Sequence, residues 1–207
     1  MAVKSTLTSM VVCLTATCLI CSAILGGVYA VTAAPIAKVN ADILKASIGQ
    51  VLPEGCEISE AMELEVGGLP SEYYVATKDG ETVGFAVKST TVGFGGPLTL
   101  MVGLIPGGTV YNTSVLSHSE TLGLGAKCTS DPKFTEQWKG FDVISKKLTV
   151  KKDGGDVDAI TASTITSRAY ALAIKNAVDA LAAVPAPCSE VSAGDAAEEM
   201  IGGNDND

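Results

Sequence analysis

Histidine and basic residues are scarce in this chain. His118 is the only histidine among 207 residues, and 14 Lys and Arg stand against 23 Asp and Glu. With a single histidine and no cysteine spacing of the zinc type, the sequence predicts no metal site. The excess of acids argues against a nucleic-acid partner, because such proteins use basic patches to neutralise phosphates.

Paired cysteines are also lacking. Cys56, Cys128 and Cys188 are scattered and odd in number, so they do not indicate a disulfide framework, although a single Cys56–Cys128 bridge stays open in an oxidising compartment. Three further cysteines imitate an iron–sulfur spacing. They lie in an apolar run, where cysteine commonly serves as packing material, and they are Cys13, Cys18 and Cys21.

Charge is absent between Met10 and Ala34, where Val, Leu, Ile, Ala and Cys dominate. As a helix, this run is long enough to cross a hydrocarbon core of about 30 Å. Small residues near its end leave a cleaved signal peptide as the rival interpretation, but the length of the apolar core favours a retained anchor over residues 1–34. Lys4 precedes the run and Lys38 follows it, so charge does not indicate the orientation.

The remaining pattern predicts one α+β domain over residues 35–184, with a central β-sheet flanked by helices. Apolar periodicity predicts helices over 36–49, 132–139 and 164–183. Strands are expected over 73–77 and 82–87 as a hairpin around Asp79-Gly80, over 98–105 and 109–116, and once or twice within 141–150. Residues 185–207 begin with a Pro-Ala-Pro break and contain six acids and no base from Glu190 onward, which predicts a disordered tail.

A polar run at 158–168, Asp-Ala-Ile-Thr-Ala-Ser-Thr-Ile-Thr-Ser-Arg, opens the last predicted helix. Free backbone N–H groups and the positive end of the helix dipole suit a phosphate at such a position. An ordinary N-cap is the simpler interpretation of the local pattern alone.

A second segment, residues 117–127, is predicted to leave a strand and enter a Gly loop with the sequence Ser-His-Ser-Glu-Thr-Leu-Gly-Leu-Gly-Ala-Lys. Its glycines permit close backbone approach to a ligand. A third segment, Gly93-Phe94-Gly95-Gly96-Pro97, precedes a hydrophobic strand and predicts a tight turn, with cofactor contact as a lesser alternative.

Together and in this order, the three segments resemble the FMN-binding subunits of ion-translocating electron-transport complexes. These are the G subunit of the Rnf complex and the C subunit of the Na⁺-pumping NADH:quinone reductase. In that family an acid, a Ser/Thr three positions later, two small residues and a Thr form the attachment site, and the Thr hydroxyl carries FMN as a phosphoester. The resemblance implies Asp158 as the acid, Thr161 as the first hydroxyl and Thr164 as the FMN phosphoryl threonine. Ala162-Ser163 stands where the family commonly has Gly-Ala.

The second segment resembles the family's His-x-Glu-Thr-Pro-Gly-Leu-Gly loop, which packs near the flavin, except that Leu122 replaces the proline. Beside Thr164, the resemblance implies cofactor-binding roles for two sets of residues. They are Asp158, Thr161, Ser163, Ile165 and Thr166 around the attachment site, and Glu120, Thr121, Gly123, Leu124 and Gly125 in the loop.

The implied function is electron transfer by a subunit with covalent FMN and no complete active site of its own, in a complex that couples ferredoxin/NAD redox chemistry to Na⁺ or H⁺ translocation. Partners would be the other Rnf-type subunits and, during maturation, a flavin transferase. The implied location is the bacterial cytoplasmic (inner) membrane, crossed once, with the FMN-binding domain on the extracytoplasmic side and the N-terminus in the cytoplasm.

Alternatives remain open at this point. The short chain favours the Rnf G subunit over the C subunit of the quinone reductase. A membrane-anchored FMN-binding sensor or assembly module outside any pump is a second hypothesis. The third is an anchored domain without a cofactor, in which Thr164 and the 123–125 loop are only a helix cap and a turn.

Overall fold

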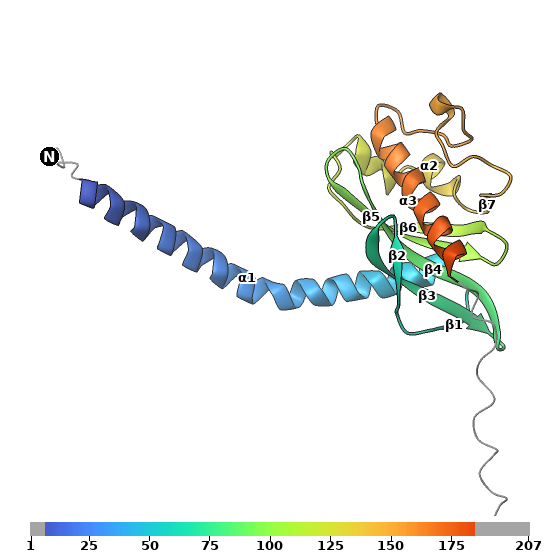
Figure 1. Ribbon diagram of the computed structural model, residues 1–207, viewed down its shortest axis with the longest axis horizontal. Helices are drawn as coiled ribbons and strands as arrows, with labels where there is room; N and C mark the ends of the chain where they lie inside the picture. The colour runs from blue at the N-terminus through green and yellow to red at the C-terminus, as the bar shows by residue number, and fades with distance from the viewer. Residues whose placement is uncertain (1–6, 185–207) are drawn as a thin grey trace, which may run out of the picture.

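A long N-terminal helix leads into a sheet domain, as a computed structural model shows for residues 7–184 (Figure 1). The tail predicted to be disordered, residues 185–207, lies outside the described residues. Helix α1 runs from Leu7 to Val51 without a break, so the helix predicted over 36–49 is the end of a longer one. Pro35 lies inside α1, which bends along its length (Figure 1), as expected where a proline removes a helical hydrogen bond.

The first part of α1 has the length and composition of a membrane span. Its most apolar 18-residue window has a mean hydropathy of 2.3 and is not buried anywhere in the described structure. Only the last turns of the helix are covered, through Ser47, Ile48 and Val51. An apolar helix with no protein covering it is the arrangement that a lipid bilayer would satisfy.

The sheet has seven strands and is antiparallel throughout, in the order β1-β3-β4-β5-β6-β7, with β2 also paired to β3. The strands are β1 Glu57–Ile58, β2 Met62–Val66, β3 Leu69–Lys78, β4 Glu81–Val92, β5 Pro97–Ile105, β6 Thr109–His118 and β7 Phe141–Asp142. The hairpin predicted around Asp79-Gly80 is confirmed, and both of these turn residues have positive φ, as the favoured hairpin turns require.

Of the one or two strands predicted within 141–150, one is present, as the two-residue strand β7. Only the two residues of β7 pair with β6, and Val150 forms an isolated bridge with Val157. The physical reason lies in Asp142, whose Oδ1 accepts hydrogen bonds from the backbone N–H groups of Ile144 at 2.9 Å and Ser145 at 3.4 Å. This local turn takes the chain out of the sheet.

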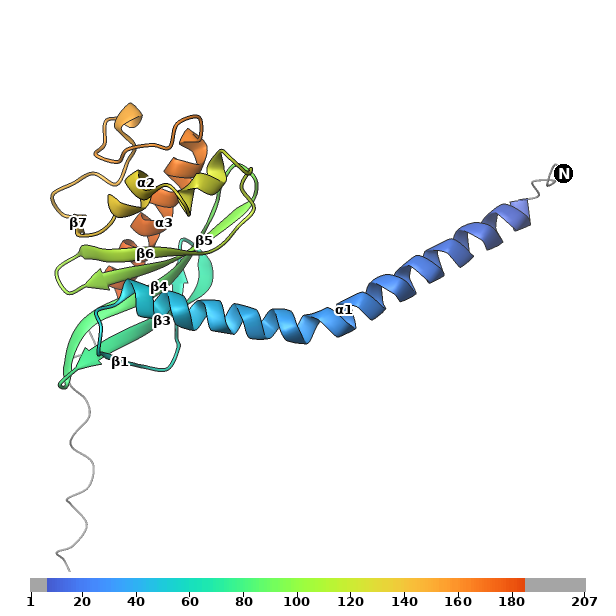
Figure 2. The ribbon, with the colours of Figure 1, turned by 180° about the vertical axis from the view of Figure 1, so that it is seen from behind.

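Helices cover both faces of the sheet (Figure 2). The alternation of side chains along β3 serves both layers, because successive residues point to opposite faces. Tyr73 and Val75 belong to the core under α3, which spans Thr164–Ala183, whereas Tyr74 and Ala76 belong to the core under the end of α1. This arrangement is the α+β class that the sequence predicted.

Hydroxyl groups of β4 attach α3 to the sheet. Ser89 Oγ donates to the carbonyl oxygen of Ala173 at 2.7 Å, and Thr91 Oγ1 donates to that of Ala169 at 3.0 Å. Both are buried, where a satisfied hydrogen bond is strongly preferred to an unpaired group. The contacts bring the start of α3 beside the turn between β4 and β5.

Apolar periodicity predicts a buried side for this helix that consists of Ile165, Ala169, Leu172, Ala173, Ala177 and Leu181, and the buried side of α3 differs from it in part. Ala169, Ala173 and Ala177 face the core as expected, but Ile165 and Leu172 are about half exposed. Tyr170 and Ile174 take the inward positions instead. Three short helices complete the domain: η1 Gly125–Cys128, α2 Pro132–Glu136 and η2 Lys151–Asp153.

Candidate functional site

A cavity of about 330 Å³ lies where the three sequence segments meet. Its size is at the low end of ligand sites, which span roughly 300–1,000 Å³, so it suits part of a nucleotide-sized molecule with the rest at the mouth. The turn after β4, the loop after β6 and the first turn of α3 form its wall. The lining residues are Phe94, Glu120, Thr121, Leu124, Gly125, Ala162, Ser163, Thr164, Ile165 and Thr166.

The first turn of α3 presents its N-terminus to this cavity. Ser163 is the N-cap residue by position, but its side chain makes no capping hydrogen bond. No acidic residue occupies the first turn, so nothing there competes with an anion for the helix dipole. The interpretation as an ordinary side-chain cap therefore loses its main support, and the N–H groups of the first turn remain suited to a phosphate.

Local hydrogen bonds explain why the chain turns into α3 at Ser163. Ser167 Oγ accepts from the Ile160 N–H at 2.9 Å and donates to the Ser163 carbonyl oxygen at 3.0 Å, and both contacts are buried. Ala162 has a φ of +61°, which costs a residue with a Cβ roughly 1–2 kcal/mol. The strained backbone lies directly before Thr164, at the cavity wall.

Glu120 joins two walls of the cavity. The residue is only 7% exposed, and its Oε1 accepts a hydrogen bond from the Phe94 N–H at 2.8 Å. Its backbone N–H donates to His118 Nδ1 at 3.3 Å. No partner for Oε2 occurs anywhere in residues 7–184. His118 thus supports the loop and is not among the residues that line the cavity.

Glycines permit this tight arrangement. A Cβ on Gly93 or on Gly125 would collide with the Glu120 carboxyl group, and one on Gly95 would collide with the backbone of Ser119. The turn after β4 and the loop after β6 can therefore approach each other only because these positions lack side chains.

Buried groups behind the cavity stay neutral. Burial is the main cause that raises the pKa of the Cys128 thiol to about 11, and the nearby negative charge of Glu120 adds to the shift. Burial also raises the pKa of Tyr170, whose hydroxyl shares a 2.8 Å hydrogen bond with Thr113 Oγ1. Cys128 lies in the core under α3 and Cys56 packs on the core under α1. Because these two cores lie on opposite faces of the sheet, the sheet separates the two cysteines of the suggested bridge. Both thiols are free.

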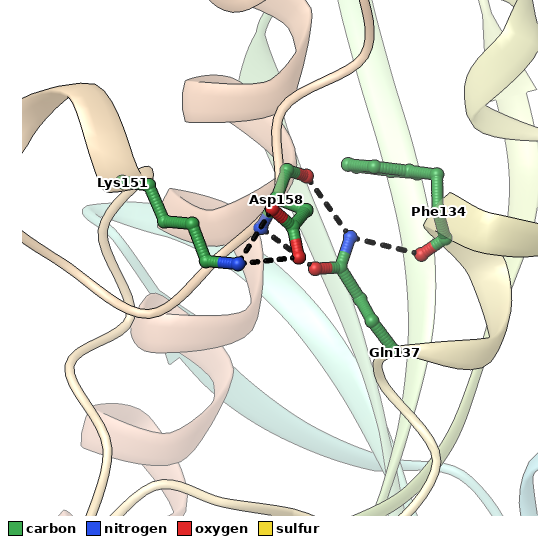
Figure 3. Close-up of polar contacts among 4 residues, drawn as sticks. All are labelled: Phe134, Gln137, Lys151 and Asp158. Atoms are coloured by element: carbon green, nitrogen blue, oxygen red, sulfur yellow. Dashed lines mark hydrogen bonds and ion pairs between the residues drawn. The ribbon is translucent and has the colours of Figure 1, made fainter.

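Three of the residues implied as cofactor contacts do not line the cavity. Thr161 and Gly123 are exposed outside the cavity. Asp158 lies earlier in the segment that leads to α3, and it is also outside the cavity. Figure 3 shows how Asp158 is held. Gln137 Nε2 donates to its carbonyl oxygen at 3.1 Å, Gln137 Oε1 accepts from its N–H at 2.9 Å, and Lys151 Nζ lies 2.7 Å from its Oδ1. Asp158 is thus rigidly positioned with an exposed carboxylate.

Two lining residues fall outside the implied set. Phe94 is 67% exposed and forms part of the rim; the Gly-rich turn that carries it was a sufficient signal, because such turns permit close approach to a ligand. Ala162 lines the wall through its positive φ, which no residue pattern at that position indicated.

The cavity offers complementary surfaces for one elongated ligand. An anion fits at the α3 N-terminus, a hydrogen-bond donor fits at Glu120 Oε2, and Phe94, Leu124 and Ile165 provide apolar contact for a flat body. A flavin mononucleotide has a phosphate, a ring imide N–H and a flat ring system, so the residues present fit this group.

Comparisons with known proteins also point to flavin mononucleotide as the ligand. The model of the FMN-binding domain family matches residues 93–179. The chain is 33% identical over 169 residues to the G subunit of the proton-translocating ferredoxin:NAD⁺ oxidoreductase complex of Clostridium ljungdahlii, covering 80% of this chain and 86% of the relative. It is 32% identical over 182 residues to the G subunit of the ion-translocating oxidoreductase complex of Methanosarcina acetivorans, covering 86% and 95%.

Among solved structures, the chain is similar to the C subunit of the Na⁺-translocating NADH-quinone reductase of Parabacteroides distasonis. The TM-score is 0.40 and the identity 25%, over 54% of this chain and 59% of that one.

Proposed function

Because this chain belongs to the family of G subunits of ion-translocating oxidoreductase complexes and carries an FMN-binding domain, we propose that it is the membrane-anchored flavin subunit of such a complex. It would pass electrons to and from redox centres of partner subunits while the complex couples ferredoxin/NAD chemistry to Na⁺ or H⁺ movement. Both relatives are named as G subunits, which favours this assignment over the C subunit of the quinone reductase.

The proposed attachment site is Thr164. Its Oγ1 would form the ester bond to the FMN phosphorus while the phosphoanhydride bond of an activated flavin donor, held by the transferase, breaks; the other phosphate of that donor would leave, and the Thr164 hydroxyl proton would be released. The observation that carries this proposal is the position of Thr164 as the first residue of α3 at the cavity wall, beside a cap position that makes no side-chain hydrogen bond. The N–H groups of the first turn would hold the phosphate oxygens, and the Ser163 and Thr166 side chains would border them.

The bound flavin would supply the electron-transfer chemistry, as cofactors do in redox proteins. The chain's own residues would orient it. Phe94, Leu124 and Ile165 would pack on the ring and limit the access of water, and Thr121 and Gly125 would border it. Burial of the ring against this wall is one means by which the protein would set the reduction potential of the flavin.

Asp158 and Thr161 would have a role before electron transfer. Asp158 is held in place by Gln137 and Lys151, yet its side chain is 68% exposed. An exposed and rigid acid a short distance ahead of the acceptor is suited to recognition by another enzyme. We therefore assign Asp158 and Thr161 to docking of the flavin transferase. Gly123 is an exposed neighbour of the cavity.

Helix α1 supports the proposed membrane anchor, whereas the side of the membrane is proposed from the family resemblance. Residues 1–34 would form the cytoplasmic N-terminus and membrane span, residues 35–184 the FMN-binding domain on the extracytoplasmic side, and residues 185–207 an acidic tail. The support is an uncovered apolar helix at one end and a folded domain at the other. A covalent bond would keep the flavin from being lost by dilution outside the cytoplasm.

Intact mass of the denatured full chain tests the attachment site, after expression with a flavin transferase. The wild type should carry one added FMN-sized mass, and Thr164→Val should lose it completely, because valine is nearly isosteric but has no hydroxyl. Ser163→Ala is the matched control and should keep the added mass. Flavin retained in Thr164→Val, or lost only in Ser163→Ala, would contradict the assignment.

A further inference from the structure

Only one of the two carboxylate oxygens of Glu120 has a hydrogen-bond partner among the described residues. Oε1 has the Phe94 N–H, whereas Oε2 has no hydrogen-bond partner within residues 7–184 and the side chain lines the cavity. Ion pairs in the described structure join Lys88 to Glu72, Lys151 to Asp158 and Arg168 to Asp153, so none of them neutralises Glu120. A buried polar oxygen without a partner is costly, which points to a ligand that completes it.

The surroundings of Oε2 are constructed for close approach. The Cα of Gly125 lies so near that a Cβ there would collide with Oε2 and with Thr166 Oγ1. Gly93 leaves room for Oε1 in the same way. The carboxyl group is therefore confined to one orientation, with Oε1 bonded to the Phe94 N–H and Oε2 buried beside Gly125 and Thr166 at the wall of the cavity.

We propose that Glu120 Oε2 accepts a hydrogen bond from the ring imide N–H of the bound flavin and that its negative charge lowers the flavin's reduction potential. The proposal rests on the flavin function proposed above. The ring, and not the polar side chain of the flavin, is assigned to this position because Phe94, Leu124 and Ile165 surround the same cavity with apolar surface. The phosphate is assigned to the backbone N–H groups of the first turn of α3, where Thr164 is the proposed attachment residue.

Glu120→Gln changes this interaction with little change in shape. The Phe94 N–H needs an acceptor, so the glutamine oxygen should remain at the Oε1 position and the amide NH₂ should take the place of Oε2. A donor then faces the donor of the flavin, and the negative charge is gone. The turn after β4 keeps its hydrogen bond, so the variant should fold.

Potentiometric titration of the flavin-loaded full chain in detergent is the first measurement. Glu120→Gln should shift the reduction potential to a more positive value, because electron uptake no longer occurs beside an anion. Glu136→Gln is the matched control, since it removes the same charge from an exposed position on α2 and should leave the potential unchanged. Equal potentials in the wild type and Glu120→Gln would overturn the proposal.

A binding measurement separates the ring N–H from other donors. Full chain made without flavin transferase is titrated with riboflavin and with N3-methylriboflavin, which lacks that N–H. The wild type should prefer riboflavin by about tenfold, the worth of a hydrogen bond to a charged group, and Glu120→Gln should lose this preference. The same preference in both proteins would overturn the proposal.

The two proposals fail in different ways. A wild type without added mass removes the covalent attachment at Thr164 but leaves the riboflavin preference to be measured. Added mass on both the wild type and Glu120→Gln, with identical potentials and identical ligand preference, keeps the attachment and removes the role of Glu120.

Discussion

At the scale of single residues, the backbone before Thr164 is strained. Ala162 has a φ of +61°, a conformation that glycine adopts freely and alanine does not. In the family motif that this segment resembles, glycine is usual at this position, whereas this chain has alanine and bears the strain.

Ala162→Gly should therefore stabilise the protein. Relief of the positive φ outweighs the added freedom of glycine in the unfolded chain, and we expect a net gain of about 1 kcal/mol, or roughly 2–4 °C in Tm for a domain of this size. Fluorescence of Trp138, the single tryptophan and fully buried, reports unfolding of the full chain in detergent.

Ala159→Gly is the control for Ala162→Gly. Ala159 is not among the described residues with positive φ, and its methyl group packs on the core under α3. Glycine there adds freedom to the unfolded chain and removes that contact, so it should lower the Tm. A lower Tm for both variants would show that strain at Ala162 does not limit stability.

At the scale of elements, the junction of α1 with the sheet depends on Gly103 in β5. A Cβ at this position would collide with the carbonyl group and side chain of Val51, the last residue of α1. The end of the helix therefore lies directly on the strand. Ile48 packs on the same face of the sheet, and Asn112 Nδ2 of β6 donates to the Gln50 carbonyl oxygen at 2.9 Å.

Gly103→Ala should push α1 away from β5 and destabilise the domain by about 1–3 kcal/mol, the usual cost of overpacking. Gly49→Ala is the matched control, because Gly49 lies near the end of the same helix with nothing within 4 Å of the added methyl. It should be neutral or stabilise by roughly 0.5–1 kcal/mol, since alanine favours a helix over glycine. Equal Tm values for the two variants, measured by Trp138 fluorescence, would show that the contact with Val51 is dispensable.

At the scale of the whole molecule, α1 is longer than a membrane requires. Its 45 residues correspond to about 68 Å at 1.5 Å per residue, whereas a hydrocarbon core of about 30 Å needs roughly 20 residues. The rest of the helix can hold the domain away from the lipid. The excess of acids over bases also disfavours contact with an anionic membrane surface.

Spheroplasts that contain the protein test both the anchor and its orientation. The chain should stay with the membranes through an alkaline carbonate wash, because a spanning helix is not released by loss of electrostatic contacts. External protease should then digest the domain in intact spheroplasts. Release by the wash would support a cleaved signal peptide, and protection from the protease would place the domain in the cytoplasm.

Local patterns were sufficient for much of the fold. The central hairpin follows from Asp79-Gly80 between alternating apolar residues, and the run before α3 has the polarity of a helix start. Patterns failed where a long-range contact or a local side chain intervened. Asp142 turned an apolar stretch out of the sheet, and the attachment of α3 through Ser89 and Thr91 set which of its apolar residues were buried.

The sequence by itself determined that this protein has one apolar helix, an α+β domain and three segments resembling a flavin-binding family, because each depends on residues close together in the chain. Only the tertiary structure decided that these segments share one cavity and that Asp158 lies outside it. It also decided that Glu120 accepts from the Phe94 N–H through one oxygen, while the other is buried without a partner among residues 7–184. The physical reason is that these properties depend on groups brought together by sheet pairing and helix packing over long stretches of chain, and no local spacing encodes that proximity.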